Sequence, residues 1–249
     1  MFETTDTGSR AVLGVIPARY GASRFPGKPL APLWGRPLLQ HVWERASQIA
    51  GLDELVIATD DDRIADAARG FGAAVEMTSP DCASGTDRVA EVARHRPPAA
   101  IVLNLQGDEP ELDARGVADL IAGMREDPDV RMATLAHPEP DPAFLDAPDV
   151  VKVWVDDAGW ALYFSRAGRA GRATSAPPLR HVGVYGFRRD FLLEFASWPE
   201  GEREQAERLE QWRALERGVR IRVYVISKGF TGVDTPEQLA ALERRGPMV

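Results

Sequence analysis

The 249-residue sequence contains little cysteine, no long apolar run and no excess of basic side chains. Cys82 is the single cysteine, so an intramolecular disulfide is excluded, and no group of Cys and His residues has zinc-ligand spacing. No stretch reaches the roughly 18 apolar residues of a membrane span, and the N-terminus has no apolar run of signal-peptide length. We therefore expect a cytoplasmic protein without a membrane partner.

The charge balance restricts the class of partner. The chain carries 30 basic and 38 acidic side chains, a formal charge of -8. A nucleic-acid surface requires a concentrated basic patch, so the sequence argues against a nucleic-acid partner. Basic residues are instead expected to act locally, in individual loops.

The domain organisation is simple. The chain is 44% apolar and 27% charged, which is typical of a globular protein. Residues 1–10 are polar and predict a flexible tail. Because residues 11–249 contain no internal repeat and no change of composition that marks a linker, we expect a single domain there.

The first half of the chain predicts alternating strands and helices. Apolar runs predict strands at Ala11–Ile16, Leu55–Thr59, Ala74–Thr78 and Ala100–Leu105, and helical periodicity predicts helices at Leu38–Ile49, Asp62–Gly70 and Gly85–His95. Continuous apolar strands between amphipathic helices indicate a mostly parallel α/β sheet that is covered on both faces. Ligands of such sheets bind beyond the carboxyl ends of the strands.

The second half is less regular. The turn signal Asp156–Gly159 predicts a β-hairpin, with strands at Val151–Val155 and Ala161–Ser165. Further strands are predicted at His181–Phe187 and Ile221–Ser227, one amphipathic helix at Glu202–Arg217, and a terminal helix from Pro236 with Thr235 as its N-cap.

A cationic loop follows the first predicted strand. Arg19, Arg24 and Lys28 lie close together among glycines and prolines, a composition suited to wrapping a polyphosphate. The loop is not a Walker A motif, because Lys28 is followed by Pro29, which cannot ligate a metal. A solvated charged loop is the structural alternative.

Acidic residues predict a magnesium site. The segment Leu103–Pro110 ends a buried strand with Gly107, Asp108 and Glu109. Mg²⁺ in phosphoryl chemistry is commonly held by one or two carboxylates together with substrate phosphates. Asp108 is the first candidate ligand and Asp234 the second. The alternative is that Asp234 only begins the terminal helix.

The segment Ser84-Gly-Thr-Asp-Arg88 has two interpretations. It is either a helix N-terminus with a hydroxyl cap, or a turn whose side chains contact the pyrimidine and ribose of a nucleoside. Its position after a predicted strand should bring it near the cationic loop and the segment Gln106–Glu109.

Taken together, the motifs resemble those of the 3-deoxy-manno-octulosonate (Kdo) cytidylyltransferase family, over about Val12 to Leu242. The matching segments are Ile16–Leu30, Ala58–Asp60, Ser84–Arg88, Gln106–Pro110, Ala161–Arg166, Arg180–Gly186, Leu209–Gln211 and Gly232–Glu237.

This resemblance implies a Rossmann-like, GT-A-like three-layer nucleotidyltransferase fold with a projecting β-hairpin that pairs two subunits. It implies a homodimer that joins CTP to a 3-deoxy-2-ulosonic acid for lipopolysaccharide or surface-polysaccharide synthesis, with Mg²⁺ held by Asp108 and Asp234. The implied catalytic residues are Arg19, Lys28, Asp108 and Asp234, and the implied nucleotide-binding residues are Pro17, Ala18, Arg19, Lys28, Thr78, Ser84, Gly85, Arg88, Gln106 and Asp108. The sugar-binding residues would be Arg166, His181, Tyr185, Glu210 and Gln211.

One segment departs from the family pattern. The segment Ala167–Ala176 is shorter than the corresponding segment of the family and lacks its Ile-Pro, its aromatic residue and its further arginine. Arg169 or Arg172 could supply the missing cation. The exact sugar acid therefore stays open, amino or shortened Kdo variants included. Related nucleotidyltransferases acting on sialic acid or a sugar phosphate, and a non-catalytic nucleotide-binding module, are the alternatives.

Overall fold

The first half of the chain folds as the predicted alternation of strands and helices. The computed structural model describes residues 11–21, 25–167, 176–227, 229–230 and 232–247. Its first strands are β1 (Val12–Ala18), β4 (Glu54–Thr59), β5 (Ala74–Met77) and β6 (Ile101–Asn104), and its first helices are α1 (Leu38–Ala46), α2 (Asp62–Gly70) and α3 (Gly85–His95). Between β1 and α1 lie the 3-10 helix η1 (Lys28–Leu30) and the short strands β2 (Pro32–Leu33) and β3 (Arg36–Pro37).

After β6 the chain contains elements that the sequence pattern did not reveal. These are α4 (Ala114–Glu126), β7 (Met132–His137), the 3-10 helix η2 (Pro142–Asp146) and α5 (Arg189–Ser197). The predicted hairpin is confirmed as β8 (Lys152–Val155) and β9 (Ala161–Ser165), which pair antiparallel. The remaining strands and terminal helix are β10 (Leu179–Arg188), β11 (Ile221–Val225) and α8 (Pro236–Arg245).

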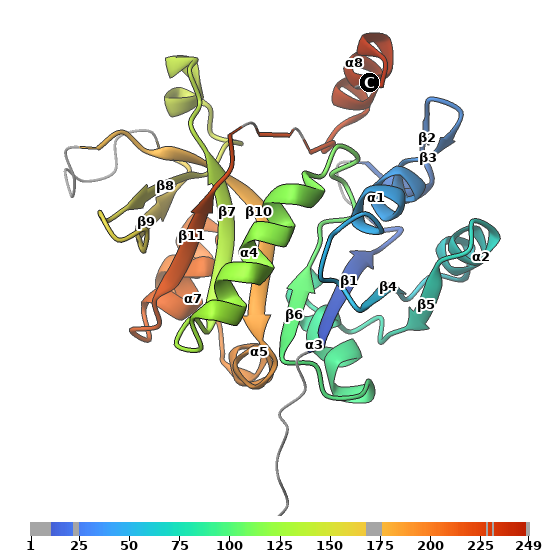
Figure 1. The fold of residues 1–249 in the computed structure, drawn as a ribbon. Coiled ribbons are helices and arrows are strands. Elements are labelled where there is room, and N and C mark those ends of the chain that lie inside the picture. The colour runs from blue at the N-terminus through green and yellow to red at the C-terminus, as the bar shows by residue number, and fades with distance from the viewer. Residues whose placement is uncertain (1–10, 22–24, 168–175, 228, 231, 248–249) are drawn as a thin grey trace, which may run out of the picture.

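Apart from β2 and β3, which pair only with each other, the strands form one mixed sheet that is mostly parallel, as predicted. Their order is β11-β7-β10-β6-β1-β4-β5, and β8 and β9 continue the sheet from β10. β10 runs antiparallel to both β6 and β7, whereas the other neighbours along this path pair in parallel. Figure 1 shows the sheet between its helices, with the carboxyl ends of β1 and β6 directed toward α1 and α8.

Helices cover both faces of the sheet and create two apolar cores. Along β1, Val12 and Ile16 face the core that contains residues of α1, α2 and α4, whereas Leu13 and Val15 face the core that contains residues of α3 and α5. This alternation follows from the period of two in a strand. It gives the three-layer architecture, and Val12, Val15 and Ile16 are fully buried.

The prediction of one helix over Glu202–Arg217 is wrong. The chain forms two short helices, α6 (Glu202–Glu207) and α7 (Gln211–Leu215). Arg208 separates them in the left-handed conformation, with φ 54° and ψ 48°. A left-handed residue cannot continue a right-handed helix, so the chain turns between the two helices.

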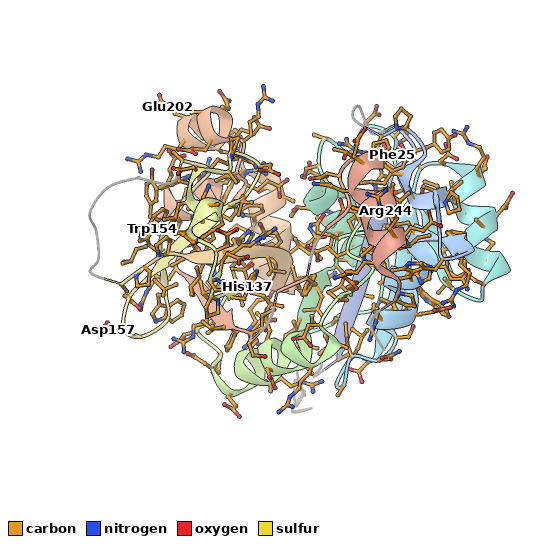
Figure 2. The ribbon with its side chains drawn as sticks, turned by 90° about the horizontal axis from the view of Figure 1, so that it is seen from above. Phe25, His137, Trp154, Asp157, Glu202 and Arg244 are labelled. Atoms are coloured by element: carbon orange, nitrogen blue, oxygen red, sulfur yellow. The ribbon has the colours of Figure 1, made fainter. Side chains whose placement is uncertain are left out.

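The loop after β1 and the terminal helix α8 lie on the opposite side of the molecule from the β8–β9 hairpin. Viewed down onto the fold, Phe25 and Arg244 lie on one side, and Trp154 and Asp157 of the β8–β9 hairpin lie on the other (Figure 2). In the described ranges, every helix is too short or too polar to cross a bilayer. Residues 1–10 and the cations Arg24, Arg169 and Arg172, for which sequence analysis made predictions, lie outside the described residues.

Candidate active site

Three segments that follow strands β1, β5 and β6 meet in one cavity of about 250 Å³. This confirms the prediction that the cationic loop, the Ser84–Arg88 segment and the Gln106–Glu109 segment converge at the carboxyl edge. The first cavity is lined by Pro17, Ala18, Arg19, Phe25, Lys28, Pro29, Cys82, Ser84, Gly85, Arg88, Gln106, Gly107, Asp108 and Asp234.

Two carboxylates and one ammonium group form the charged centre of this cavity. Lys28 Nζ lies 2.6 Å from Asp108 Oδ2 and 3.5 Å from Asp234 Oδ1. Both distances are measured from the same Lys28 nitrogen, so the two carboxylate oxygens can be no farther apart than the sum of the distances, about 6.1 Å. Residues that are far apart in the sequence thus share one site, as predicted.

Local interactions place Asp108 and Asp234 side by side. Val233 N donates a 2.8 Å hydrogen bond to Asp108 O, which joins the two segments through their backbones. Thr235 caps α8 and forms a capping box with Gln238, so the helix cap is Thr235 and not Asp234. The Asp234 carboxylate is therefore directed to the cavity side rather than used as the cap.

Arg88 is buried beside the first cavity, with only 4% of its surface exposed. Its guanidinium donates to Thr78 Oγ1 and lies 3.4 Å from Asp60 Oδ1. Thr78 does not line the cavity but orients Arg88. Ser84 begins α3 through a capping box with Asp87, so the helix-cap interpretation of this segment is correct, and both Ser84 and Arg88 line the cavity as well.

A second cavity, of about 430 Å³, adjoins the first. The two cavities share four lining residues, Gly85, Gln106, Asp108 and Asp234. The other residues that line the second cavity are Thr86, Asn104, Glu109, Asp149, Val150, Val151, Arg166, Arg180, His181, Val182, Gly183, Tyr185, Arg208, Leu209, Glu210, Gln211, Phe230, Gly232 and Gln238. The five residues assigned to the sugar acid by resemblance are among them.

Hydrogen bonds fix the side chains on the far wall of the second cavity. Thr86 Oγ1 donates a 2.5 Å bond to Glu210 Oε2, and the Gln211 amide donates to the Tyr185 hydroxyl. Gln211 Oε1 is buried without a protein partner. The left-handed turn at Arg208 is what directs Glu210 and Gln211 to this wall, because it ends α6 before them.

A bulge in β10 arranges a further pair of side chains. The pairing of β10 with β7 shifts register between Val182 and Tyr185. His181, just before the bulge, approaches Thr134 Oγ1 with its Nε2 at 2.9 Å. Thr134 Oγ1 also lies 2.7 Å from Val184 O. A hydroxyl has one proton, so when Thr134 donates it to Val184 O, the His181 Nε2–H is the donor to Thr134.

Burial shifts the pKa of several groups at the second cavity. Burial, and then the charge of Arg166, lower the pKa of His181 to about 3. Burial, reinforced by the Asp108 carboxylate, holds the pKa of Glu109 well above its usual range. Burial also raises the pKa of Glu210, partly offset by the Thr86 and Ser84 hydroxyls. The cavity thus combines a neutral imidazole with carboxyl groups whose ionisation is disfavoured.

Sequence reasoning missed other residues of the two cavities. Phe25 lines the first cavity, and Asp149 and Arg180 line the second. Glu109 belonged to a recognised motif but was given no role, although Glu109 Oε2 is buried without a partner. The adjacent carboxylates Asp108 and Glu109 in one motif could have indicated that both line a binding site.

Within the described residues, no group of three or more His, Cys, Asp or Glu side chains could hold a metal ion. Asp108 and Asp234 are a pair of hard oxygen ligands that already converge on one cation, the Lys28 ammonium. Such a pair suits Mg²⁺, which is usually bound by one or two carboxylates while substrate phosphates and waters complete its shell. The donor set therefore fits the expected ion.

Comparison with known proteins identifies the family. The cytidylyltransferase family model matches residues 13–221. A 3-deoxy-manno-octulosonate cytidylyltransferase of Solibacter usitatus is 48% identical over 238 residues, covering 94% of each chain, and one of Escherichia coli is 48% identical, covering 95% of this chain and 94% of its own. An 8-amino-3,8-dideoxy-manno-octulosonate cytidylyltransferase of Shewanella sediminis is 47% identical, covering 93% and 96%.

The solved structures agree with the sequence comparisons. A CMP:2-keto-3-deoxy-manno-octonic acid synthetase complexed with CTP superposes with a TM-score of 0.89 at 45% identity, covering 94% of this chain and 98% of its own. A cytidylyltransferase from Leptospira borgpetersenii, at 17% identity and a TM-score of 0.65, shares the fold. This chain therefore belongs to the 3-deoxy-manno-octulosonate cytidylyltransferase family of nucleotidyltransferases.

Proposed function

We propose that the protein joins CTP to Kdo, a 3-deoxy-2-ulosonic acid, and releases pyrophosphate and CMP-Kdo. The observation that carries this proposal is that the two cavities meet at Asp108 and Asp234. A nucleotide in the first cavity and a sugar acid in the second would bring their reacting atoms together beside these carboxylates. Relatives named for this reaction support the assignment.

The first cavity supplies the groups that would hold CTP. Arg19 and Lys28 would bind the phosphates, as charge-assisted donors. Ser84 and Arg88 would contact the cytidine, and Thr78 would keep Arg88 oriented through its hydroxyl. The ring oxygen of cytosine needs a donor and its exocyclic amine an acceptor, so donors alone cannot recognise the base, and backbone carbonyls would supply the acceptor.

Asp108 and Asp234 would hold Mg²⁺ when the substrates are bound. The ion would neutralise phosphate charge and lower the pKa of the attacking hydroxyl. Lys28, now paired with both carboxylates, would then be available to the phosphates.

The reaction needs no protein nucleophile. The anomeric hydroxyl oxygen of the sugar acid would form a bond to the α-phosphorus, and the bond from that phosphorus to the oxygen bridging to the β-phosphate would break. Pyrophosphate leaves with the electron pair, and the hydroxyl proton passes to water. The residues contribute by positioning both substrates and by neutralising charge, through Arg19 and Lys28 on the leaving pyrophosphate.

The second cavity would orient the sugar acid. The Arg166 guanidinium would pair with the carboxylate of the sugar acid, and Glu210, Gln211 and Tyr185 would bond its hydroxyls. Gln211 Oε1 and Glu109 Oε2 are buried without protein partners and so could bond ligand hydroxyls. His181 would act as a neutral hydrogen-bonding group.

An amino sugar is the second candidate substrate. Relatives named 8-amino-3,8-dideoxy-manno-octulosonate cytidylyltransferase are 47% identical, close to the value for the Kdo enzymes. The segment that departs from the family pattern, Ala167–Ala176, follows directly on Arg166 and would be the place where the two substrates are distinguished.

Pyrophosphate release tests the proposal. The purified protein is incubated with CTP or UTP, with Mg²⁺ or with a chelator, and with Kdo, 8-amino-Kdo or sialic acid in turn. We expect release with CTP, Kdo and Mg²⁺, and at least tenfold less with UTP, the discrimination that one good hydrogen bond gives. If pyrophosphate is released only with another sugar acid, that acid replaces Kdo as the proposed substrate. If no sugar acid leads to pyrophosphate release, a non-catalytic nucleotide-binding module is favoured.

A further inference from the structure

Lys152 is a fully buried lysine in strand β8, with none of its surface exposed. Burial lowers the pKa of its ammonium group, and an ammonium group buried without partners is strongly unfavourable. Lys152 lines neither cavity. No role for it follows from the proposed chemistry, so the reason for placing a lysine here has to come from its contacts.

The Lys152 ammonium joins two separate segments through their backbones. Lys152 Nζ donates a 2.7 Å hydrogen bond to Ala147 O, just after η2, and another of 2.7 Å to Arg166 O, just after β9. These are charge-assisted bonds, which are stronger than neutral ones. Lys152 thus fixes the position of the Arg166 backbone relative to residues 147–151.

Arg166 is held from its other sides as well. Its backbone N–H approaches Glu207 Oε2 at 3.4 Å, and Ser165 Oγ lies 3.3 Å from the same carboxylate oxygen. The Arg166 guanidinium donates to Asp149 O at 3.3 Å. Arg166 and Asp149 both line the second cavity, and the Lys152 bonds connect the segments that carry them.

We propose that Lys152 is a positioning residue for anionic sugar-acid binding: by holding the carbonyl of Arg166 and the loop at Ala147, it keeps the Arg166 guanidinium directed into the second cavity. The inference rests on the proposed function, because it assigns the substrate carboxylate to Arg166. Glu207 supports the same position from the N–H side of Arg166. The chain thus uses a carboxylate at the backbone N–H of Arg166 and a buried cation at its carbonyl to fix one binding residue.

The test compares Lys152→Met with Glu207→Gln in the intact enzyme. Methionine keeps an unbranched, flexible side chain that is one heavy atom shorter, and it removes the charge and both hydrogen bonds. For Lys152→Met we expect the KM for Kdo to rise roughly ten- to a hundredfold, the range for a misplaced binding group, while the KM for CTP changes by less than about twofold. For Glu207→Gln, which is partly exposed and should fold normally, we expect a smaller rise in the KM for Kdo alone.

Arg96→Met is the matched control. Arg96 is a partly buried cation that pairs with Glu76 and Glu54, away from both cavities. We expect this variant to lose thermal stability without a change in either KM. A merely structural role for Lys152 would produce the same pattern in Lys152→Met, or would shift both KM values together, and either result overturns the proposal.

The outcomes separate this inference from the proposed function. Suppose that the wild type turns over Kdo and that both variants fold. An unchanged KM for Kdo in Lys152→Met and in Glu207→Gln would then reject only the role of Lys152. If Lys152→Met does not fold, an unchanged KM for Kdo in Glu207→Gln rejects it. Absence of turnover in the wild type would reject the proposed function, and the Lys152 proposal with it.

Discussion

At the scale of single residues, burial determines which groups at the second cavity carry charge. The imidazole of His181 is kept neutral because its pKa is lowered to about 3, and ionisation of Glu109 is disfavoured because its pKa is raised well above the usual range. An anionic ligand therefore finds no positive charge on His181. In the proposed function the carboxylate of the sugar acid is therefore paired by arginine, the role proposed for Arg166.

The pKa of His181 predicts a pH dependence of stability. Between pH 6.5 and about 3 the unfolded chain binds a proton at this residue and the native state does not, so the free energy of unfolding falls as the pH is lowered through this range. The contribution is at most about 1.4 kcal/mol per pH unit.

His181→Gln removes this titration. In urea denaturation between pH 7 and pH 4.5, we expect the variant to lose less stability than the wild type, whereas other acid-sensitive groups affect both proteins equally. Parallel pH profiles for the two proteins would show that His181 titrates normally in the native state.

The carboxylates Asp108 and Asp234 give the sharpest prediction at this scale. Substitution by asparagine keeps the size and removes one charge, so a metal-binding role predicts a loss of about 10²-fold or more in kcat for either variant, as for lost transition-state electrostatics. Asp113→Asn is the control, because Asp113 caps α4 and asparagine is an equally good cap. Normal magnesium-dependent turnover in both Asp108→Asn and Asp234→Asn would end the proposed mechanism.

At the scale of elements, the ends of β1 and β6 have to approach closely to form the site. A Cβ added at Gly107 would lie 2.9 Å from Pro17 O, a backbone atom that cannot move aside without shifting the loop after β1. Gly107 therefore sets the distance between the cationic loop and Asp108. This glycine is required by space, not by a positive φ.

Gly107→Ala tests this close approach. We expect a loss of about 1–3 kcal/mol in the free energy of unfolding, typical of overpacking, together with a lower kcat because Asp108 moves relative to Lys28. Gly70→Ala is the control, since nothing lies within 4 Å of a Cβ added at the end of α2, and it should leave turnover unchanged and stability equal or slightly raised. Wild-type stability and turnover in Gly107→Ala would show that the two segments can separate at no cost.

The sequence predicted some elements well because their patterns are local. The helices at Asp62–Gly70 and Gly85–His95 were predicted with their observed ends, and Asp61 and Ser84 cap their N-termini. The break at Arg208 was not predictable, because an arginine in the left-handed region carries no sequence signal comparable to glycine. The antiparallel direction of β10 and its bulge also depend on tertiary pairing with β6 and β7, which periodicity does not report.

At the scale of the whole molecule, the site combines residues from Pro17 to Gln238 at one edge of the sheet. The convergence of the first three segments was predictable, because parallel strands place their carboxyl ends together. The second cavity was not, since Arg166 directly follows β9 and Tyr185 lies on β10, two strands whose order in the sheet the sequence does not give. Their assignment came from resemblance to the family alone.

The family resemblance predicts that two subunits assemble into a dimer joined through the β8–β9 hairpin. Leu162 in β9 is 43% exposed, although it is a large apolar side chain, as expected for a residue that a second subunit would cover. We expect a dimer mass by light scattering at micromolar concentration, and Leu162→Arg should shift the mass toward the monomer because it places a charge in the interface. Met77→Arg is the matched control, because Met77 is equally exposed but lies on β5, at another edge of the sheet. A monomer mass for the wild type would refute the dimer, and equal dissociation of both variants would place the interface elsewhere.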